Sequence, residues 1–207
     1  MKKGGFMKDA LILFAITLIS GTLLGAVYSV TKDPIEKASM AASLATYQEV
    51  YADAADFKSD QALQDAADKL PEALAAAGLE LGAVELPVAL NAVDASGTVV
   101  GHIFSVTTKE GYGGDIQLSV GVTLDGTVTG IGFLQLSETP GLGMNATNPK
   151  FKDQFSGKKA ESLVLTKGGA SADNEIDAMS GATITSTAVT NAVNAVLYFA
   201  KNCIPQS

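Results

Sequence analysis

An uncharged stretch near the N-terminus limits what this chain can fold into. Residues 10–30 contain no Asp, Glu, Lys or Arg. At about 1.5 Å of rise per residue, a helix of this length crosses a hydrocarbon core about 30 Å thick. A cleaved signal peptide is the alternative, but its apolar region usually spans about 7–15 residues. The longer run favours an uncleaved transmembrane helix over residues 10–30.

The charges beside this stretch predict its orientation. Lys2, Lys3 and Lys8 precede it, whereas the residues that follow mix a lysine with two acids. Lysines close to a membrane span stay on the cytoplasmic side. We therefore expect residues 1–9 in the cytoplasm and residues 31–207 on the extracytoplasmic side of the cell membrane, after a single pass.

Small residues form a stripe along the same stretch. Thr17, Gly21, Gly25 and Ser29 recur every fourth residue, with Gly-x-x-x-Gly in the middle. Small side chains let membrane helices approach one another closely. The stripe favours packing against a partner helix over a lone anchor that faces lipid.

The composition excludes several classes of function. The net charge is −8 and all 14 basic residues are lysine, so a nucleic-acid-binding surface is disfavoured. One histidine, His102, and one cysteine, Cys203, make a zinc or iron–sulfur site improbable. Neither residue stands in a catalytic pattern, and His102 is best explained as a partly buried structural residue. Any redox chemistry must then come from an organic cofactor or a partner.

The rest of the chain predicts one α+β domain. Residues 35–79 are rich in Ala and acidic residues and indicate helices, broken near Ser59 and Pro71. From residue 84 to 136 the pattern changes to about four antiparallel strands. Residues 116–124 alternate apolar and polar side chains, which is typical of a half-buried strand, and Asp125-Gly126 supplies a hairpin turn.

The last third of the chain returns to helices. Asn148-Pro149 predicts the start of a short helix, and residues 163–165 predict a further strand. A longer helix is expected over residues 184–201. Its buried face is expected to carry four apolar side chains, namely Val189, Val193, Val196 and Ala200.

A hydroxyl-rich segment leads into that last helix. Residues 177–186 read Asp-Ala-Met-Ser-Gly-Ala-Thr-Ile-Thr-Ser. Backbone N–H groups at a helix start are unpaired and favour an anion, and Gly181 removes a side chain where a ligand would approach. The absence of Gly-Lys-[Ser/Thr] excludes a P-loop. The segment therefore predicts a different kind of phosphate site, with hydroxyls from Ser180, Thr183, Thr185 and Ser186.

The same segment resembles the flavin-attachment motif of the FMN-binding proteins in the Rnf and Na⁺-pumping NADH:quinone reductase complexes, Asp-x-x-[Ser/Thr]-Gly-Ala-Thr-x-[Ser/Thr]. The resemblance implies that a flavin transferase, which recognises Asp177, esterifies Thr183 to the FMN phosphate. It also implies that the neighbouring residues Ser180, Gly181, Ala182, Thr185 and Ser186 surround the cofactor. An ordinary helix start is the alternative.

Two further segments extend the resemblance. Residues 138–143 read Glu-Thr-Pro-Gly-Leu-Gly and are similar to a segment of the same family. Pro140-Gly141 predicts a turn in this loop. The resemblance implies that Glu138 and Thr139 contact the flavin and that Leu142 packs on the isoalloxazine. Residues 111–114 are similar to a Gly-Tyr-x-Gly segment, which places Tyr112 and Gly113 either near the flavin or on the sheet.

The pattern therefore favours an electron relay, because no acid–base pair marks a substrate pocket. The resemblance implies a covalent-FMN electron-transfer subunit of an ion-translocating ferredoxin:NAD⁺ oxidoreductase (Rnf) complex, with other membrane subunits as partners, one of them larger and also flavinylated. A C-type subunit of the Na⁺-translocating NADH:quinone reductase is the nearest alternative, although the short chain and compact anchor resemble the Rnf subunit more. A membrane-anchored module that binds a phosphorylated ligand non-covalently, and an accessory protein without a cofactor, remain open.

Overall fold

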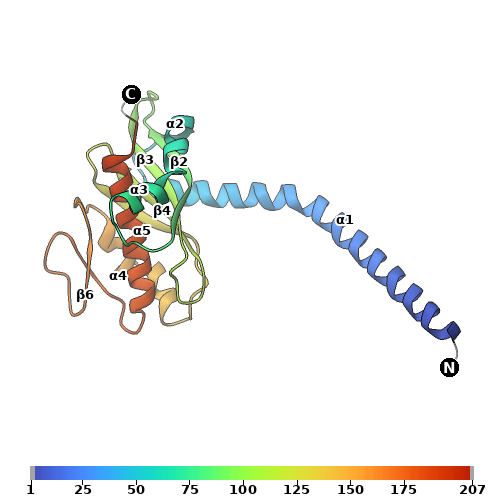
Figure 1. The fold of residues 1–207 in the computed structure, drawn as a ribbon. Helices are drawn as coiled ribbons and strands as arrows, with labels where there is room; N and C mark the ends of the chain where they lie inside the picture. Colours follow the sequence, from blue (N-terminus) through green and yellow to red (C-terminus); the bar gives the residue numbers. More distant parts are fainter. Residues whose placement is uncertain (1–2, 206–207) are drawn as a thin grey trace. The chain divides into compact units, whose positions relative to one another are not determined.

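The computed structural model of this chain describes residues 3–205, and it describes the side chains of residues 7–31 and 41–205. The chain forms two compact units, Met1–Ser43 and Leu44–Ser207. The second unit combines helices with an antiparallel sheet, so the predicted α+β class is confirmed (Figure 1).

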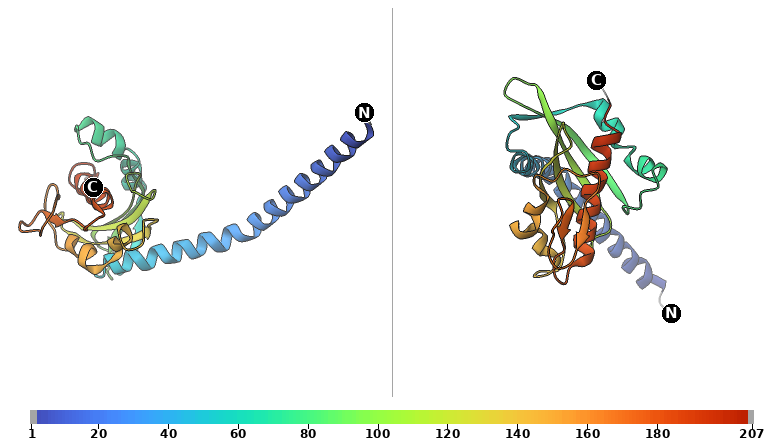
Figure 2. Two further views of the ribbon diagram at one scale, coloured as in Figure 1. Left: turned by 90° about the horizontal axis from the view of Figure 1, so that it is seen from below. Right: turned by 90° about the vertical axis from the view of Figure 1, so that its left-hand side faces the viewer.

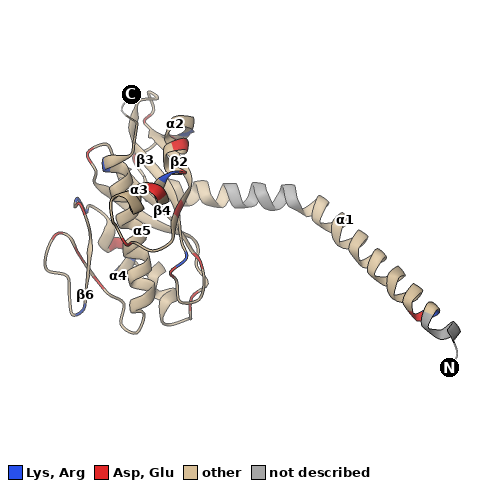
Figure 3. Ribbon diagram, viewed as in Figure 1, with Lys and Arg blue, Asp and Glu red and all other residues tan. Residues whose placement is uncertain are grey.

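The first unit consists of most of helix α1 (Lys3–Val50). Within it, Met7–Thr31 is long and apolar enough to cross a membrane. Its large apolar side chains are exposed, and none of its residues after Asp9 is charged (Figure 3). A core helix of a soluble protein would bury such side chains. Of the flanking charges, Lys8 is described and exposed, whereas Lys2 and the side chains of Lys3, Lys32, Asp33 and Glu36 lie outside the described residues.

The main sheet of the second unit has five antiparallel strands in chain order. They are β1 (Asp56–Ser59), β2 (Val84–Val93), β3 (Val99–Thr108), β4 (Ile116–Thr123) and β5 (Val128–Gln135). The expectation of about four strands missed β1, which lies in the region expected to be helical. This edge strand is only four residues long and is held by its pairing with the end of β2. Tertiary pairing, rather than local pattern, creates it.

Short helices follow each of the two edge strands, β1 and β5, along the chain. Helices α2 (Gln61–Ala67) and α3 (Leu70–Ala76) confirm the expected break before Pro71. The expected helix at Pro149 is also present, as α4 (Pro149–Lys152). It stands between two short 3₁₀ helices, η1 (Gly143–Thr147) and η2 (Asp153–Phe155). A second, parallel pair of strands joins β6 (Val164–Thr166) to β7 (Glu175–Asp177).

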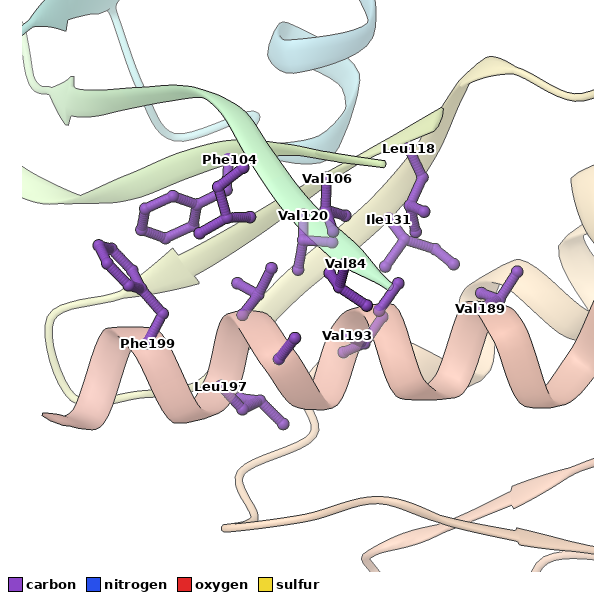
Figure 4. Packing of buried hydrophobic residues seen from close by; sticks show 14 of the residues in the cluster. Val84, Phe104, Val106, Leu118, Val120, Ile131, Val189, Val193, Leu197 and Phe199 are labelled. Carbon is purple, nitrogen blue, oxygen red and sulfur yellow. The ribbon is translucent and has the colours of Figure 1, made fainter. Parts of the chain in front are cut away.

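Helix α5 (Thr183–Asn202) lies in the hollow of the curved sheet (Figure 2). It packs on β3 and β4 and also contacts β6 and α3. Val189, Val193 and Val196 are fully buried as predicted, whereas Ala200 is only half-buried. Phe104 and Phe199 meet edge to face, with 5.4 Å between ring centroids (Figure 4). This helix fixes the hydroxyl-rich segment, residues 177–186, relative to the sheet.

Strand β4 is buried on both faces, so the prediction of a half-buried strand at residues 116–124 is wrong. Ser119 and Gly121 of β4 are as buried as the apolar residues between them. The end of α1 covers this second face: a Cβ at Gly121 would lie 3.1 Å from the Val50 side chain. The hydroxyl of Thr129 donates to the Val50 carbonyl over 2.7 Å, and the Tyr47 and Ser105 hydroxyls are also 2.7 Å apart. Thr129 and Ser105 on this face therefore bond to α1 instead of facing water, and Ser119 donates to the Gly132 carbonyl of β5.

Candidate functional site

The hydroxyl-rich segment turns from the end of β7 into α5, and Thr183 is the first residue of the helix. Gly181 adopts φ +75°, which favours glycine. Ala182 occupies the N-cap position, and no side chain caps the helix there. Thr183 is exposed. The start of α5 thus presents an accessible hydroxyl beside uncapped backbone N–H groups, which is the arrangement that suits a phosphate.

The other hydroxyls of the segment differ in their surroundings. Ser180 is exposed, whereas Thr185 and Ser186 are buried, with 1% and 0% of their surface accessible. The Ser186 hydroxyl donates to the Ala182 carbonyl over 2.8 Å and accepts from the Met179 N–H over 3.0 Å. Ser186 therefore shapes the turn, and Thr183 and Ser180 present the hydroxyls that a ligand can reach.

Glu138 links the two loops that the sequence singled out. Its side chain is 7% exposed, and its Oε1 accepts hydrogen bonds from the N–H groups of Tyr112, over 2.8 Å, and Gly113, over 3.2 Å. Gly113 also approaches the other loop directly, since a Cβ there would lie 2.1 Å from the Ser137 carbonyl oxygen. Glu138 thus positions the 111–114 loop against the 137–143 loop.

The 137–143 loop in turn packs on the start of α5. A Cβ at Gly143 would lie 2.6 Å from Glu138 Oε2 and 2.7 Å from the Thr185 hydroxyl oxygen. A Cβ at Gly181 would lie 3.1 Å from Cδ2 of Leu142. These close approaches bring all three predicted segments together at one end of α5.

The residues that remain accessible there include two large side chains. Tyr112 is 71% exposed, so its ring does not pack on the sheet, and Leu142 is 44% exposed. Thr139, Gly113 and Gly141 are also exposed. The site therefore offers an aromatic and an aliphatic side chain that a flat ring could contact.

Gln154 holds the first residue of the segment and has no counterpart in the sequence motif. Its amide Oε1 accepts from the Asp177 N–H over 2.7 Å, and its Nε2 donates to the Asp177 carbonyl over 3.3 Å. The Asp177 carboxylate accepts from the Gly169 N–H over 3.1 Å. Nothing in the local pattern could have indicated Gln154, because its role depends on how η2 meets β7.

A pocket of about 430 Å³ adjoins the segment. Its lining includes Ser180, Met179, Lys150 and Asp177, so it combines apolar surface with one positive and one negative charge. A larger cleft of about 550 Å³ lies at the opposite end of α5. The smaller pocket is the better candidate for a ligand attached near Thr183, because its lining includes part of the motif and that of the larger cleft does not. Its lining residues are Asn145, Asn148, Lys150, Phe151, Gln154, Gly168, Asp177, Ala178, Met179 and Ser180.

Two protein families match parts of this chain. Residues 111–198 match the FMN-binding domain family, and residues 1–50 match the RnfG N-terminal region. The first match covers all three segments that converge on α5.

Similar proteins extend over almost the whole chain. The G subunit of the Na⁺-translocating ferredoxin:NAD⁺ oxidoreductase complex of Acetobacterium woodii is 38% identical over 90% of this chain and 87% of its own length. The G subunit of the ion-translocating oxidoreductase complex of Methanosarcina acetivorans is 31% identical, over 92% of each. The C subunit of the Na⁺-translocating NADH-quinone reductase of Vibrio anguillarum is 44% identical, but only over 34% of this chain and 31% of its own. The chain therefore belongs to the G-subunit family of the ion-translocating oxidoreductase (Rnf) complexes.

Proposed function

We propose that this chain is the electron-transferring G subunit of an ion-translocating ferredoxin:NAD⁺ oxidoreductase complex and that it carries FMN as a phosphoester of Thr183. One observation carries the proposal: the Thr183 hydroxyl is exposed at an uncapped start of α5, where three separate segments of the chain converge. Bound FMN would supply an acceptor and donor of one or two electrons.

The residues present fit this group. The first-turn N–H groups of α5 and the Ser180 hydroxyl can bind the phosphate oxygens. Leu142 and Tyr112 can contact the ring, and Lys150 adds a positive charge in the adjoining pocket. Without arginine, no bidentate guanidinium contact to the phosphate is available. Backbone groups and hydroxyls therefore carry more of the binding, and the covalent bond keeps the ring in place whatever their affinity.

The mass of the denatured protein tests the proposal. Purified from cells that make a flavin transferase, the full chain is expected to exceed its sequence mass by about 438 Da, which is FMN of about 456 Da less one water. A chain at its sequence mass that releases a phosphorylated ligand on denaturation would support a non-covalent binding module instead. A chain with neither would support an accessory protein without a cofactor.

We also propose that residues 1–9 lie in the cytoplasm, residues 10–30 in the membrane, and residues 31–207 on the extracytoplasmic side. The family match to the G subunit of membrane complexes and the exposed apolar side chains of Met7–Thr31 support an anchor. The lysines before the span support the orientation. In that compartment a dissociated cofactor would be lost, and the phosphoester prevents that loss.

The orientation predicts where a lysine reagent can react. A membrane-impermeant amine label on intact cells is expected to modify lysines of the second unit, such as the exposed Lys159 and Lys201. Broken cells should show little further labelling of that unit. Labelling that requires broken cells would place the domain in the cytoplasm and remove the argument for covalent retention.

We propose that the small-residue stripe packs against a helix of a larger, flavinylated membrane subunit. Apart from the adjacent residues and backbone of α1 itself, no described atom lies within 4 Å of a Cβ built on Gly21 or Gly25, so there is space beside both glycines. Gly25→Leu is expected to separate the helices and reduce co-purification of the complex severalfold, while FMN attachment persists. Leu24→Ala, beside the stripe, is the matched control. Wild-type co-purification of Gly25→Leu would show that the stripe faces lipid.

A C-type subunit of the NADH:quinone reductase is the second candidate, and the extent of similarity weighs against it. The C-subunit relative matches about a third of this chain, whereas two G-subunit relatives match about nine-tenths. Identification of the proteins that co-purify with the wild-type chain separates the two assignments. A ferredoxin-oxidising assembly supports the first, and a quinone-reducing assembly supports the second.

A further inference from the structure

The cleft at the C-terminal end of α5 is separate from the site described above. It has a volume of about 550 Å³, within the usual range of about 300–1,000 Å³ for ligand pockets. It lies between the last turn of α5, the turn that joins β4 to β5, and residues 159–161. Its lining residues are His102, Thr123, Leu124, Asp125, Gly126, Lys159, Ala160, Glu161, Leu197, Ala200, Lys201, Ile204 and Pro205.

His102 lines this cleft, and a hydrogen bond at its Nδ1 fixes the tautomer of the ring. The Asn91 amide nitrogen donates to Asp60 Oδ2 over 3.2 Å, and a carboxylate can only accept, so the Asn91 oxygen must face His102. That oxygen lies 2.9 Å from His102 Nδ1, which therefore carries the hydrogen. The N–H group of Leu63, with further help from Asn91 and Ala62, keeps the pKa of Asp60 below its usual value and the carboxylate ionised.

The other ring nitrogen of His102 is left as an acceptor. His102 is only 8% exposed, yet Nε2 has no hydrogen-bond partner among the described residues. All fully enclosed side-chain nitrogen and oxygen atoms in this part of the chain do have a partner. Nε2 must therefore be accessible, and the cleft is the space that His102 lines. Burial lowers the pKa of His102, against the opposing charge of Asp60, so the ring is neutral at pH 7–8.

The remaining walls of the cleft define what can bind there. Lys159 pairs with Asp125 over 2.6 Å, and Lys201 pairs with Glu161, so the four charges cancel. Leu197, Ala200, Ile204 and Pro205 supply apolar surface. The cleft therefore carries no net charge that would attract a charged ligand.

We propose that this cleft binds a small uncharged molecule that donates a hydroxyl hydrogen to Nε2 of His102 and lays an apolar body against the end of α5. Phenols are the simplest members of this class. The site does not overlap the flavin site, because Thr183 and Lys201 stand at opposite ends of one helix, about 27 Å apart at 1.5 Å per residue. The ligand would therefore act on the stability of the domain and not on the flavin directly.

A titration with resorcinol tests the proposal on the full chain in lipid nanodiscs at pH 8. His102 is the single histidine, so ring-labelled histidine gives one NMR signal to follow. We expect this signal to shift and saturate with resorcinol. The probe 1,3-dimethoxybenzene, which lacks hydroxyl donors, should bind about fivefold more weakly, the effect of one neutral hydrogen bond. No saturation with resorcinol, or equal binding of the ether, would overturn the proposal.

Variants locate the binding site by saturation-transfer NMR, which observes the probe. Ala200→Leu places a larger side chain in the cleft and should abolish resorcinol binding. His102→Phe keeps a ring but removes the acceptor, and it should weaken binding about fivefold. Thr187→Ala, exposed near the other end of α5, should bind as the wild type does. Wild-type binding by Ala200→Leu would show that resorcinol binds elsewhere and would contradict the proposal. Thermal unfolding of each variant checks that it remains folded.

Discussion

Thr183→Ala is expected to lose all covalently attached FMN while the domain remains folded. Thr183 is exposed, no side chain caps the helix at that point, and its hydroxyl makes no hydrogen bond to the described residues. Alanine is also the residue most compatible with a helix. The substitution should therefore change the unfolding temperature by no more than about 2 °C, which corresponds to about 0.5 kcal/mol on a domain of this size. In-gel flavin fluorescence and the mass of the denatured chain measure the loss.

Thr187→Ala is the matched control for this loss. Thr187 lies one turn further along α5, is also exposed, and donates its hydroxyl hydrogen to the Thr183 carbonyl over 2.9 Å. It should retain full FMN attachment. If Thr183→Ala still gained about 438 Da, the attachment point would lie elsewhere; buried Thr185 would then need local opening before it could react.

Gly113→Ala is expected to separate the two loops of the site. Its Cβ would lie 2.1 Å from the Ser137 carbonyl oxygen and 3.2 Å from Glu138 Cα, and both are backbone atoms that cannot rotate away. As the loops part, the buried Glu138 carboxylate loses hydrogen bonds from Tyr112 and Gly113. Overpacking and a lost buried bond each cost about 1–3 kcal/mol. The unfolding temperature should therefore fall by about 5–15 °C, and FMN attachment should fall severalfold.

Gly130→Ala provides the control for the Gly113 substitution. It also changes a glycine to alanine, here within strand β5, but its Cβ would lie 3.5 Å from the Val50 carbonyl oxygen, an ordinary contact. Its effect on unfolding should stay within about 0.5 kcal/mol. A Gly113→Ala protein as stable as Gly130→Ala, with full attachment, would show that the loop contact is not needed.

The sequence predicted those parts of the fold that depend on local pattern. Helix α5, strands β3–β5 and the turn at Asp125-Gly126 follow from periodicity and glycine placement, and the structure confirms them. Strand β1 and the buried second face of the sheet depend on segments distant in the sequence. Ser119 and Thr129 look like solvent-facing residues until the end of α1 covers them.

The candidate site also combines features that the sequence predicts with features that depend on tertiary structure. The three motif segments could be found from the sequence, and the structure places them at one end of α5. The link between them could not, because it consists of Glu138 bonding to the backbone of another loop and of Gln154 pairing with the backbone of Asp177. Such bonds use backbone groups that almost every residue possesses, so no residue type indicates them. The pocket beside Ser180 is likewise a product of tertiary packing.

The burial of Tyr47 and Val50 against the sheet limits where this protein can be truncated. Both residues belong to α1, yet they lie in the compact unit that starts at Leu44. A protease acting between residues 41 and 44 would release an intact water-soluble domain. Cleavage after Ala54 would instead remove Tyr47, Val50 and Tyr51 together and expose one face of five strands. Any soluble fragment meant for flavin chemistry or crystallisation must therefore begin no later than Leu44.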